Sequence, residues 1–432
     1  MQKILFTLFT SCLLFTQLSA LIIETPNLNR FEETLETIDQ QSLVLFDVDE
    51  TLLIPKEEMC RTVNEQLAKF QLRHLAKTGE WLSDQEALSI EPGLYSINEV
   101  LDAVSENYRP SINQAISLIA PKEAVDKIQF KPLLGGLTKS KVFRVDIENK
   151  KYVLRLLDEN QPPERKRSEL NAHKIGAGCK IAPEIIYADQ TPLVILMEYI
   201  EGRTLTKDDL NNADIVKKVM CALKKFHQHP KERDLIRRTK VEAIQGLYDR
   251  YKNKKGVVFP SCFDQLHSEL KNDFAELKTE HMPSHGDFNP RNILIAENGH
   301  IYIIDWAQAS IDHPFLDIGW LATFSAANNE QVRGLLREYL EREPKESELK
   351  EALFFKDVTT FLVATLWIGR QEERNQIKLD SILEGSLKNG SAYIMDDISV
   401  EDILKEKKMS LTLYSLGWLK EFIDSRRETT EQ

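Results

Sequence analysis

The chain has 432 residues, 42% of them apolar, which is enough to bury two or three hydrophobic cores and predicts a globular, multidomain protein. Its net charge of −12 argues against a nucleic-acid partner, because binding to a phosphate backbone requires a basic face. The five cysteines form no CxxC pair and have no regular spacing, so neither a disulfide framework nor a zinc site is indicated.

The first 20 residues, MQKILFTLFTSCLLFTQLSA, have the order of a secretory signal peptide. A positive charge at Lys3 precedes an apolar run, residues 4–18, and small residues follow at Ser19 and Ala20. The run is short for a membrane-spanning helix. Three interpretations stay open: a cleaved leader, an uncleaved anchor that would be the contact with a membrane, and a buried first helix. The first two imply an exported or anchored protein, and the third a cytoplasmic one.

The segment DVDET follows a short apolar run, residues 42–46, that is typical of a buried strand carrying Asp47 and Asp49 at its carboxyl end. The pattern resembles the first motif of haloacid dehalogenase-like phosphatases, which implies that Asp47 is a nucleophile, Asp49 a general acid/base and Thr51 an orienting hydroxyl. Residues 52–122 show mainly helical periodicity and offer no second strand that ends in Ser or Thr. An intact second phosphoryl site and a truncated module both stay open.

Two β-type runs, residues 141–148 and 152–157, predict a hairpin closed by a turn. Gly135 and Gly136 precede the hairpin, and Thr138 adds a hydroxyl donor. Glycines at such a place let the backbone approach phosphates, although a glycine pair beside a strand is also common in simple turns. We interpret these three residues as candidate contacts to nucleotide phosphates.

Arg155 lies in the middle of the second run, between Leu154 and Leu156. A cation there is costly unless an anion accompanies it. Glu169, in the helical stretch RKRSELNAHKIG, is the candidate partner; a solvated helix glutamate is the alternative.

The apolar strand in TPLVILMEYIEGRTL turns polar at EYIEG. Such a connector suits a hinge between two lobes, in which the backbone of Glu198 and Ile200 holds a purine. The next stretch, residues 214–230, repeats apolar side chains with the 3.6 period of a core-facing helix. His227 and His229 at its end are interpreted as structural, because no third metal ligand is near them in the sequence.

The stretch SHGDFNPRNILIAENGHIYIIDWAQAS places Asp287 and Asn292 five residues apart in a loop, and Asp305 after an apolar strand, residues 301–304. This is the spacing of the protein-kinase catalytic loop and its metal-binding acid. The chemistry requires one carboxylate to accept the proton of a substrate hydroxyl, and an amide and a second carboxylate to hold Mg²⁺ against nucleotide phosphates. We therefore predict Asp287 as the catalytic base and Asn292 and Asp305 as metal ligands.

HGDFNPRNIL with IIDW resembles the aminoglycoside phosphotransferase and choline/ethanolamine kinase family, and the resemblance extends from residue 129 to residue 426. It implies a bilobal protein-kinase-like fold that uses ATP and Mg²⁺. LGGLTKSKVFRV is similar to the GGLTN segment of the choline-kinase branch. The resemblance also implies that Arg155 takes the place of the kinase strand lysine, with Glu169 as its helix partner. Asp317, in FLDIGWLATF, is implied to be a structural acid.

Two departures from the choline-kinase branch concern the acceptor. The branch usually reads IDWEY or IDFEY, whereas Ala307 and Gln308 follow Trp306 here, so the acid after the aromatic residue is missing. Trp367 in FLVATLWIGRQ matches the second tryptophan of WxLWxxxQ, whose aromatic residues cage a quaternary ammonium, but Ala364 stands at the first. Trp367 is either half of a cage or a core aromatic, and we expect the acceptor over residues 306–367.

The sequence therefore predicts an α+β bilobal protein-kinase-like fold, preceded by a partial α/β haloacid dehalogenase-like module. The expected segments are a signal peptide or anchor (1–20), the partial module (21–122), the N-lobe with the hinge (123–202) and the C-lobe (203–432). The expected activity is ATP- and Mg²⁺-dependent phosphorylation of a small-molecule hydroxyl, on an amino alcohol such as choline or ethanolamine, an aminoglycoside or a sugar-like compound. The alternative is an exported phosphatase or binding protein with an inactive kinase-like domain.

Overall fold

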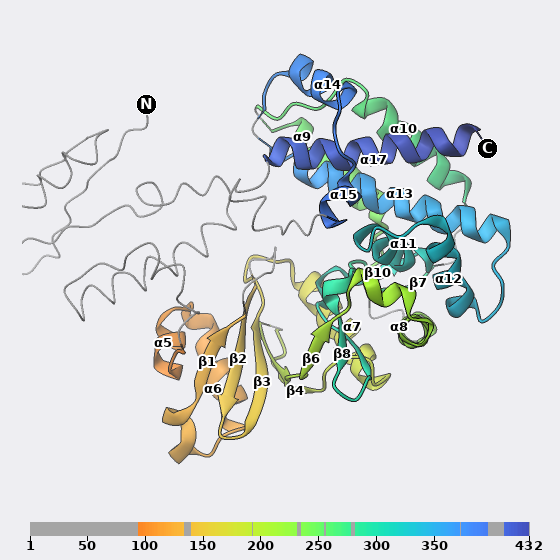
Figure 1. Ribbon diagram of the computed structural model, residues 1–432. Helices are drawn as coiled ribbons and strands as arrows, with labels where there is room; N and C mark the ends of the chain where they lie inside the picture. Colours follow the sequence, from red (N-terminus) through yellow and green to blue (C-terminus); the bar gives the residue numbers. More distant parts are fainter. Residues whose placement is uncertain are drawn as a thin grey trace, which may run out of the picture. The chain divides into compact units, whose positions relative to one another are not determined.

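The structure, a computed structural model, describes residues 94–431 apart from 134–139, 192, 231–234, 255, 278–280, 372 and 396–409. These residues belong to one compact unit, Pro92–Gln432 (Figure 1). Several predicted features lie outside the described residues: the leader, the DVDET segment with Asp47 and Asp49, and the residues Gly135, Gly136 and Thr138.

An antiparallel five-stranded sheet, in the order β1-β2-β3-β5-β4, forms the N-terminal lobe. Its strands are β1 (Gln129–Pro132), β2 (Lys141–Ile147), β3 (Lys150–Leu156), β4 (Ile185–Ala188) and β5 (Val194–Glu198). The predicted hairpin is confirmed as β2 and β3, and Glu148 takes the left-handed conformation in its turn, with φ of 52°. Alternate residues of β2 are buried, as expected for a strand with one face on a core.

Helices α5 (Ile97–Asp102) and α6 (Arg109–Ser117) pack against this sheet (Figure 1). Ile112 and Ile116 of α6 are buried in the same apolar cluster as Phe130 of β1. The N-terminal lobe thus includes helices that lie ahead of residue 123, where the sequence analysis began this lobe.

Helix α7 (Pro163–Gly178) follows β3 and carries Glu169. It begins at Pro163, a residue that suits the first helical position because its missing N–H would have no partner there. Glu169 and Leu170 are buried on the face that meets the sheet and the C-terminal lobe. The helix thus holds a carboxylate within reach of β3.

The C-terminal lobe combines short strands with many helices. Its strands are β6 (Gly202–Thr204), β7 (Met282–Ser284), β8 (Ile293–Ala296), β9 (Ile301–Ile303) and β10 (Ser310–Asp312), paired as β6-β8-β9 and β10-β7. Its helices are α8 (Ala213–His227), α9 (Lys240–Lys252), α10 (Phe263–Glu276), α11 (Phe315–Phe324), α12 (Asn329–Leu340), α13 (Glu346–Ile368), α14 (Gln376–Glu384), α15 (Gly390–Met395) and α17 (Leu411–Glu431).

Helix α13 packs against α11 and α17 in the core of this lobe (Figure 1). Its residues are buried on most faces, from Leu349 to Ile368, as expected for a central helix. Within the described part of the chain, no helix has both the length and the apolar composition needed to cross a membrane.

Asp357 places a carboxyl group in the interface between α13 and α17. Its Oδ1 accepts a hydrogen bond from Ser425 Oγ at 2.7 Å. Burial raises the pKa of Asp357 to about 7, although Ser425 and the positive charge of Arg426 oppose the shift. The folded protein therefore binds a proton here more tightly than the unfolded chain does.

Asp357→Asn should stabilise the protein selectively at high pH. The contribution of the native carboxyl to stability is complete below the unfolded pKa and is lost as the pH rises through about 7. The amide stays neutral and can still accept from Ser425, so we expect a gain on the order of 2 kcal/mol in unfolding free energy at pH 8 and little gain at pH 5. Urea denaturation at both pH values measures this, and equal effects at the two would contradict it.

Candidate active site

The loop between β7 and β8 joins Asp287 to Asn292. The amide nitrogen of Asn292 donates to the backbone carbonyl of Asp287 at 2.9 Å and to its Oδ2 at 3.2 Å. Asn289 Nδ2 donates to Asp287 Oδ1 at 2.9 Å. The predicted pair is therefore in direct contact, and both carboxylate oxygens of Asp287 have amide donors.

Gly286 precedes Asp287 in a conformation that suits only glycine. Its φ is 73°, and a Cβ at this position would lie 2.3 Å from the carbonyl oxygen of Gln308. His285, before it, donates from Nε2 to the carbonyl of Ile304 at 2.9 Å and accepts at Nδ1 from the N–H of Asp287 at 3.3 Å. Burial lowers the pKa of His285, consistent with this neutral form. The backbone of His285 and Gly286 is thus fixed in the conformation that presents the side chain of Asp287.

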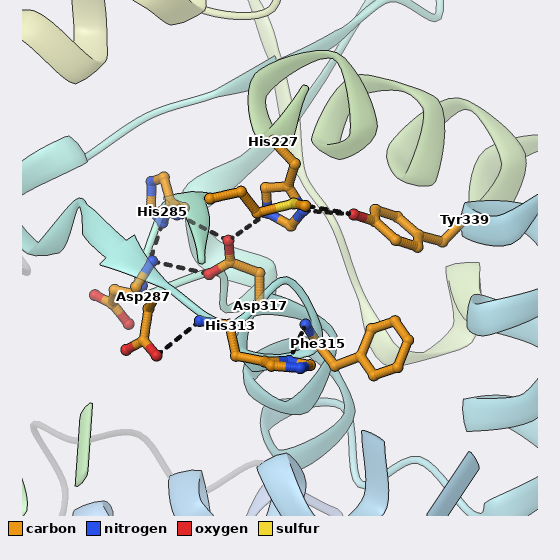
Figure 2. Close-up of polar contacts among 10 residues, drawn as sticks. His227, His285, Asp287, His313, Phe315, Asp317 and Tyr339 are labelled. Atoms are coloured by element: carbon orange, nitrogen blue, oxygen red, sulfur yellow. Dashed lines mark hydrogen bonds and ion pairs between the residues drawn. The ribbon is translucent and has the colours of Figure 1, made fainter. Parts of the chain in front are cut away.

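Asp317, in the first turn of α11, holds this loop through hydrogen bonds to its backbone (Figure 2). Its carboxylate is fully buried and accepts the backbone N–H groups of His285 and Gly286, each at 2.8 Å. His227 Nε2, at the end of α8, donates to the same carboxylate at 2.9 Å, and its Nδ1 lies 2.9 Å from the hydroxyl of Tyr339. Asp317 and His227 thus form a buried support for the loop.

The environment of Asp287 shifts the pKa of its carboxyl group toward neutral pH. Burial raises the pKa of Asp287 to about 7. The amides of Asn289 and Asn292 and the positive charge of Lys240 oppose this rise, whereas the negative charge of Asp305 adds to it. A base with such a pKa is effective at physiological pH.

Asp305 and Arg155 meet across the two lobes. Arg155 Nη2 donates to Asp305 Oδ1 at 2.8 Å, and Arg155 Nε lies 2.9 Å from Glu169 Oε1. The expected pairing of Arg155 with Glu169 is present, and the contact with Asp305 is an addition. Burial opposes the charge on Asp305, but Arg155 outweighs it and holds the pKa of Asp305 below its usual range.

Asp305 lies next to Asn292 through the backbone. The N–H of Ile304 donates to the carbonyl of Asn292 at 2.9 Å, which extends the pairing of β8 with β9. Asp305 itself has φ of 58°, a left-handed conformation that aspartate adopts more readily than most residues. Asn292 and Asp305 therefore lie next to each other, at the ends of the paired strands β8 and β9.

The predicted hinge residues lie at the end of β5 and in the connector that follows it. Glu198 ends β5, and its N–H donates to the carbonyl of Glu184 at 3.0 Å, so this N–H is already bound. Ile200 follows in the connector before β6.

Trp367 is only 3% exposed and packs edge-on to Tyr414. Of its two interpretations, the structure therefore supports the core aromatic.

Two functional candidates were missed by the sequence interpretation. Lys240, the first residue of α9, is buried beside Gly286 and Asp287. Tyr339, from α12, extends the support of the loop through His227. Neither belongs to a motif, and both reach the site only through the packing of distant helices.

The family model of the phosphotransferase enzyme family matches residues 129–351. No curated protein sequence matches the chain. Among solved structures, a choline kinase from Cryptosporidium parvum is 14% identical and covers 75% of this chain and 97% of its own, with a TM-score of 0.51. LicA in complex with AMP is 16% identical and covers 74% and 98%, also with a TM-score of 0.51.

A third solved structure is a choline/ethanolamine kinase family protein from Mesorhizobium loti, at 18% identity, with coverage of 71% and 99% and a TM-score of 0.48. The two structures that score 0.51 agree with the sheet and helices described above in showing a bilobal protein-kinase-like fold. The chain belongs to the phosphotransferase enzyme family and is a small-molecule kinase.

His227→Ala should weaken both the fold and turnover. The change leaves the buried carboxylate of Asp317 with one donor fewer, which we expect to cost about 3 kcal/mol in unfolding free energy. Loosening His285 and Gly286 should also lower kcat more than it changes nucleotide affinity. Tyr339→Phe, which removes only the outer hydroxyl, should cost about 1 kcal/mol. Denaturation and steady-state kinetics measure these effects, and a His227 variant with unchanged turnover would refute the supporting role.

Proposed function

We propose that this chain transfers the γ-phosphoryl group of ATP, with Mg²⁺, to a hydroxyl group of a small molecule. The observation that carries the proposal is that Asp287 and Asn292 are hydrogen-bonded to each other, and that Asp305 follows the strand residue Ile304, which is bonded to Asn292. Arg155 pairs with Asp305 and contacts Glu169. Each of these side chains has a distinct task in phosphoryl transfer, which depends mainly on positioning and on charge stabilisation.

Asp287 acts on the acceptor. It accepts the proton of the acceptor hydroxyl as the hydroxyl oxygen forms a bond to the γ-phosphorus and the bond from this phosphorus to the bridging oxygen breaks. Its pKa of about 7 suits this exchange, and its amide donors fix the orientation of the carboxylate. ADP leaves with the negative charge of the broken bond.

The residues fit a magnesium nucleotide. Asn292 and Asp305 offer an amide oxygen and an anionic carboxylate, the hard oxygen donors that Mg²⁺ prefers, and the other ligands would be phosphate oxygens and water. When bound, Mg²⁺ and ATP supply the phosphoryl group and neutralise its developing charge. Glu169 and Asp305 hold the pKa of Arg155 above its ordinary value despite burial, so Arg155 brings a permanent positive charge toward the α- and β-phosphates.

The remaining nucleotide contacts stay predictions from the sequence. Gly135, Gly136 and Thr138 would cover the phosphates, and the backbone of Glu198 and Ile200 would hold the purine. One solved structure of similar fold was determined with AMP, which supports a nucleotide in this place.

The acceptor is a small molecule with a hydroxyl group: an amino alcohol, an aminoglycoside or a sugar-like compound. The printed names of similar structures include choline, ethanolamine, macrolide and aminoglycoside kinases or phosphotransferases. No observation on the described residues favours the alternative of an inactive kinase-like domain, since the acids and the amide of the motif all remain.

The full chain should bind ATP only together with Mg²⁺. At a ligand concentration about 100 times Kd, binding should stabilise the fold by about 2.7 kcal/mol, which appears as a rise of the melting temperature. EDTA should abolish the rise, because the carboxylate of Asp305 alone repels the phosphates. Differential scanning fluorimetry tests this, and a shift insensitive to EDTA would oppose the metal assignment.

Substitutions of Asp287 and of Asp305 should have different effects on transfer and on nucleotide binding. Asp287→Asn should abolish transfer while Mg·ATP binding persists, because the amide cannot accept the hydroxyl proton. Asp305→Ala should weaken Mg·ATP binding itself, about tenfold or more, because a charged metal ligand is lost. Isothermal titration with ATP and an ADP-release assay distinguish these effects. Equal losses of nucleotide affinity in both variants would overturn the division of tasks.

A further inference from the structure

A buried lysine lies directly behind the loop that carries Asp287 (the catalytic loop, residues 285–292). Lys240 is the first residue of α9 and is only 6% exposed. The position that a Cβ on Gly286 would take lies 2.9 Å from Lys240 Nζ and 3.1 Å from its Cε. The ammonium group therefore rests against the backbone of the residue that precedes Asp287.

The same ammonium group reaches the turn that follows Asp305. Lys240 Nζ donates long hydrogen bonds to the backbone carbonyl and to Oε1 of Gln308, at 3.4 and 3.5 Å. Gln308 ends the short 3-10 helix Trp306–Gln308, which begins directly after Asp305. The carbonyl oxygen of Gln308 is also the atom nearest to the position of a Cβ on Gly286. Lys240, Gly286 and Gln308 thus meet where the catalytic loop touches the turn after Asp305.

The backbone around Lys240 is fixed by hydrogen bonds to two other elements. The N–H of Ile236 donates to Ser168 Oγ of α7 at 3.2 Å, and the carbonyl of Ile236 accepts from the N–H of Ile311 in β10 at 2.8 Å. The N–H of Lys240 itself donates to Asp312 Oδ2 of β10 at 2.7 Å. Because its backbone is fixed and its side chain is enclosed, the ammonium group of Lys240 is confined to this place.

Buried carboxylates of the chain balance the charge of Lys240. Burial raises the pKa values of Asp287 and Asp312 to about 7, and the positive charge of Lys240 opposes both rises. Burial lowers the pKa of Lys240, and the negative charges of Asp312, Asp287 and Asp317 oppose this change. Each charge thus offsets part of the desolvation of the others. The lysine therefore belongs to the internal structure of the site and needs no bound anion.

Removal of the ammonium group would change the catalytic loop in two ways. The backbone of Gly286 and the carbonyl of Gln308 would lose the group that lies between them, so their spacing could relax. The buried carboxylates of Asp287 and Asp312 would lose a shared cation and would repel each other. Both changes act on the direction of the Asp287 side chain.

We propose that Lys240 is a positioning residue for phosphoryl transfer: its ammonium group holds Gly286 against Gln308 and thereby keeps Asp287 directed at the acceptor hydroxyl. The inference rests on the proposed function and adds a residue that lies outside the sequence motif. Lys240 acts through the backbone of the catalytic loop. It takes no part in the bond changes, in which the hydroxyl proton passes to Asp287.

Lys240→Met removes the charge and keeps a long, flexible side chain. We expect kcat for ADP release to fall by about tenfold or more, because Asp287 is held less often in the productive direction. The Kd for Mg·ATP should change by less than about twofold, because Asn292, Asp305 and Arg155 remain. ADP release from Mg·ATP is measured with water alone and with choline, ethanolamine and an aminoglycoside, and isothermal titration gives the Kd.

Lys356→Met is the matched control. Lys356, on α13, also donates to a backbone carbonyl, that of Ala327, at 2.8 Å. Burial raises the pKa values of Asp357 and Glu421, and the positive charge of Lys356 opposes both rises. This lysine thus has the same chemistry outside the catalytic loop. Its loss should lower the melting temperature and leave kcat within about twofold, when each variant is assayed well below its melting temperature.

A second variant keeps the test decisive if Lys240→Met does not fold. Lys240→Gln is neutral and shorter than lysine, and its polar amide is tolerated more easily beside buried carboxylates. We expect the same loss of kcat at unchanged Kd. A kcat within about twofold of the native value in a folded Lys240 variant would overturn the inference, as would an equal loss of kcat in Lys356→Met. A loss of Mg·ATP affinity as large as the loss of kcat would also overturn it, because Lys240 would then act on the nucleotide.

The native protein separates the failure of this inference from that of the proposed function. If the full chain binds no Mg·ATP and releases no ADP with any of these acceptors, the proposed function fails and the role of Lys240 fails with it. If the native chain binds and consumes Mg·ATP while the Lys240 variants lose stability alone, the lysine only balances buried charge. The proposed function then stands, and the positioning role is overturned.

Discussion

The buried carboxylate of Asp317 is the constraint on which the candidate active site depends. A charge without exposure is costly in a protein interior, and here three donors offset the cost: two backbone N–H groups and the ring of His227. Because two of the donors belong to the backbone of His285 and Gly286, Asp317 fixes the path of the loop rather than one side chain. The direction of Asp287 follows from that path.

Arg155 provides the second constraint, between the lobes. One guanidinium contacts Glu169 of α7 through Nε and Asp305 of the C-terminal lobe through Nη2. A planar group with several donors can reach two carboxylates at once, whereas the single ammonium of a lysine presents one point of charge. The choice of arginine at this strand position therefore ties the helix, the sheet and the metal-binding acid into one arrangement.

The parts of the site that were predictable are local in sequence. Asp287 and Asn292 are five residues apart and hydrogen-bonded, and the hairpin that carries Arg155 shows plain β periodicity. The contact of His227 with Tyr339 spans 112 residues, and that of Lys240 with Gln308 spans 68. No local pattern encodes such contacts, because they arise when separate helices pack. The packing of α5 and α6 on the sheet was missed for the same reason, since their helical periodicity does not specify a partner.

The catalytic loop by itself does not fix the chemistry of the acceptor. The loop and its support by Asp317 are built from backbone contacts, so they are indifferent to what enters. Selectivity for an acceptor instead has to come from side chains around the loop, such as Ala307, which stands where the choline-kinase branch has an acid. Specificity is the difference between two free energies of binding, so one side chain that stabilises one acceptor or repels another changes it. A few substitutions around an unchanged catalytic loop are therefore sufficient, in energetic terms, to change the preferred acceptor.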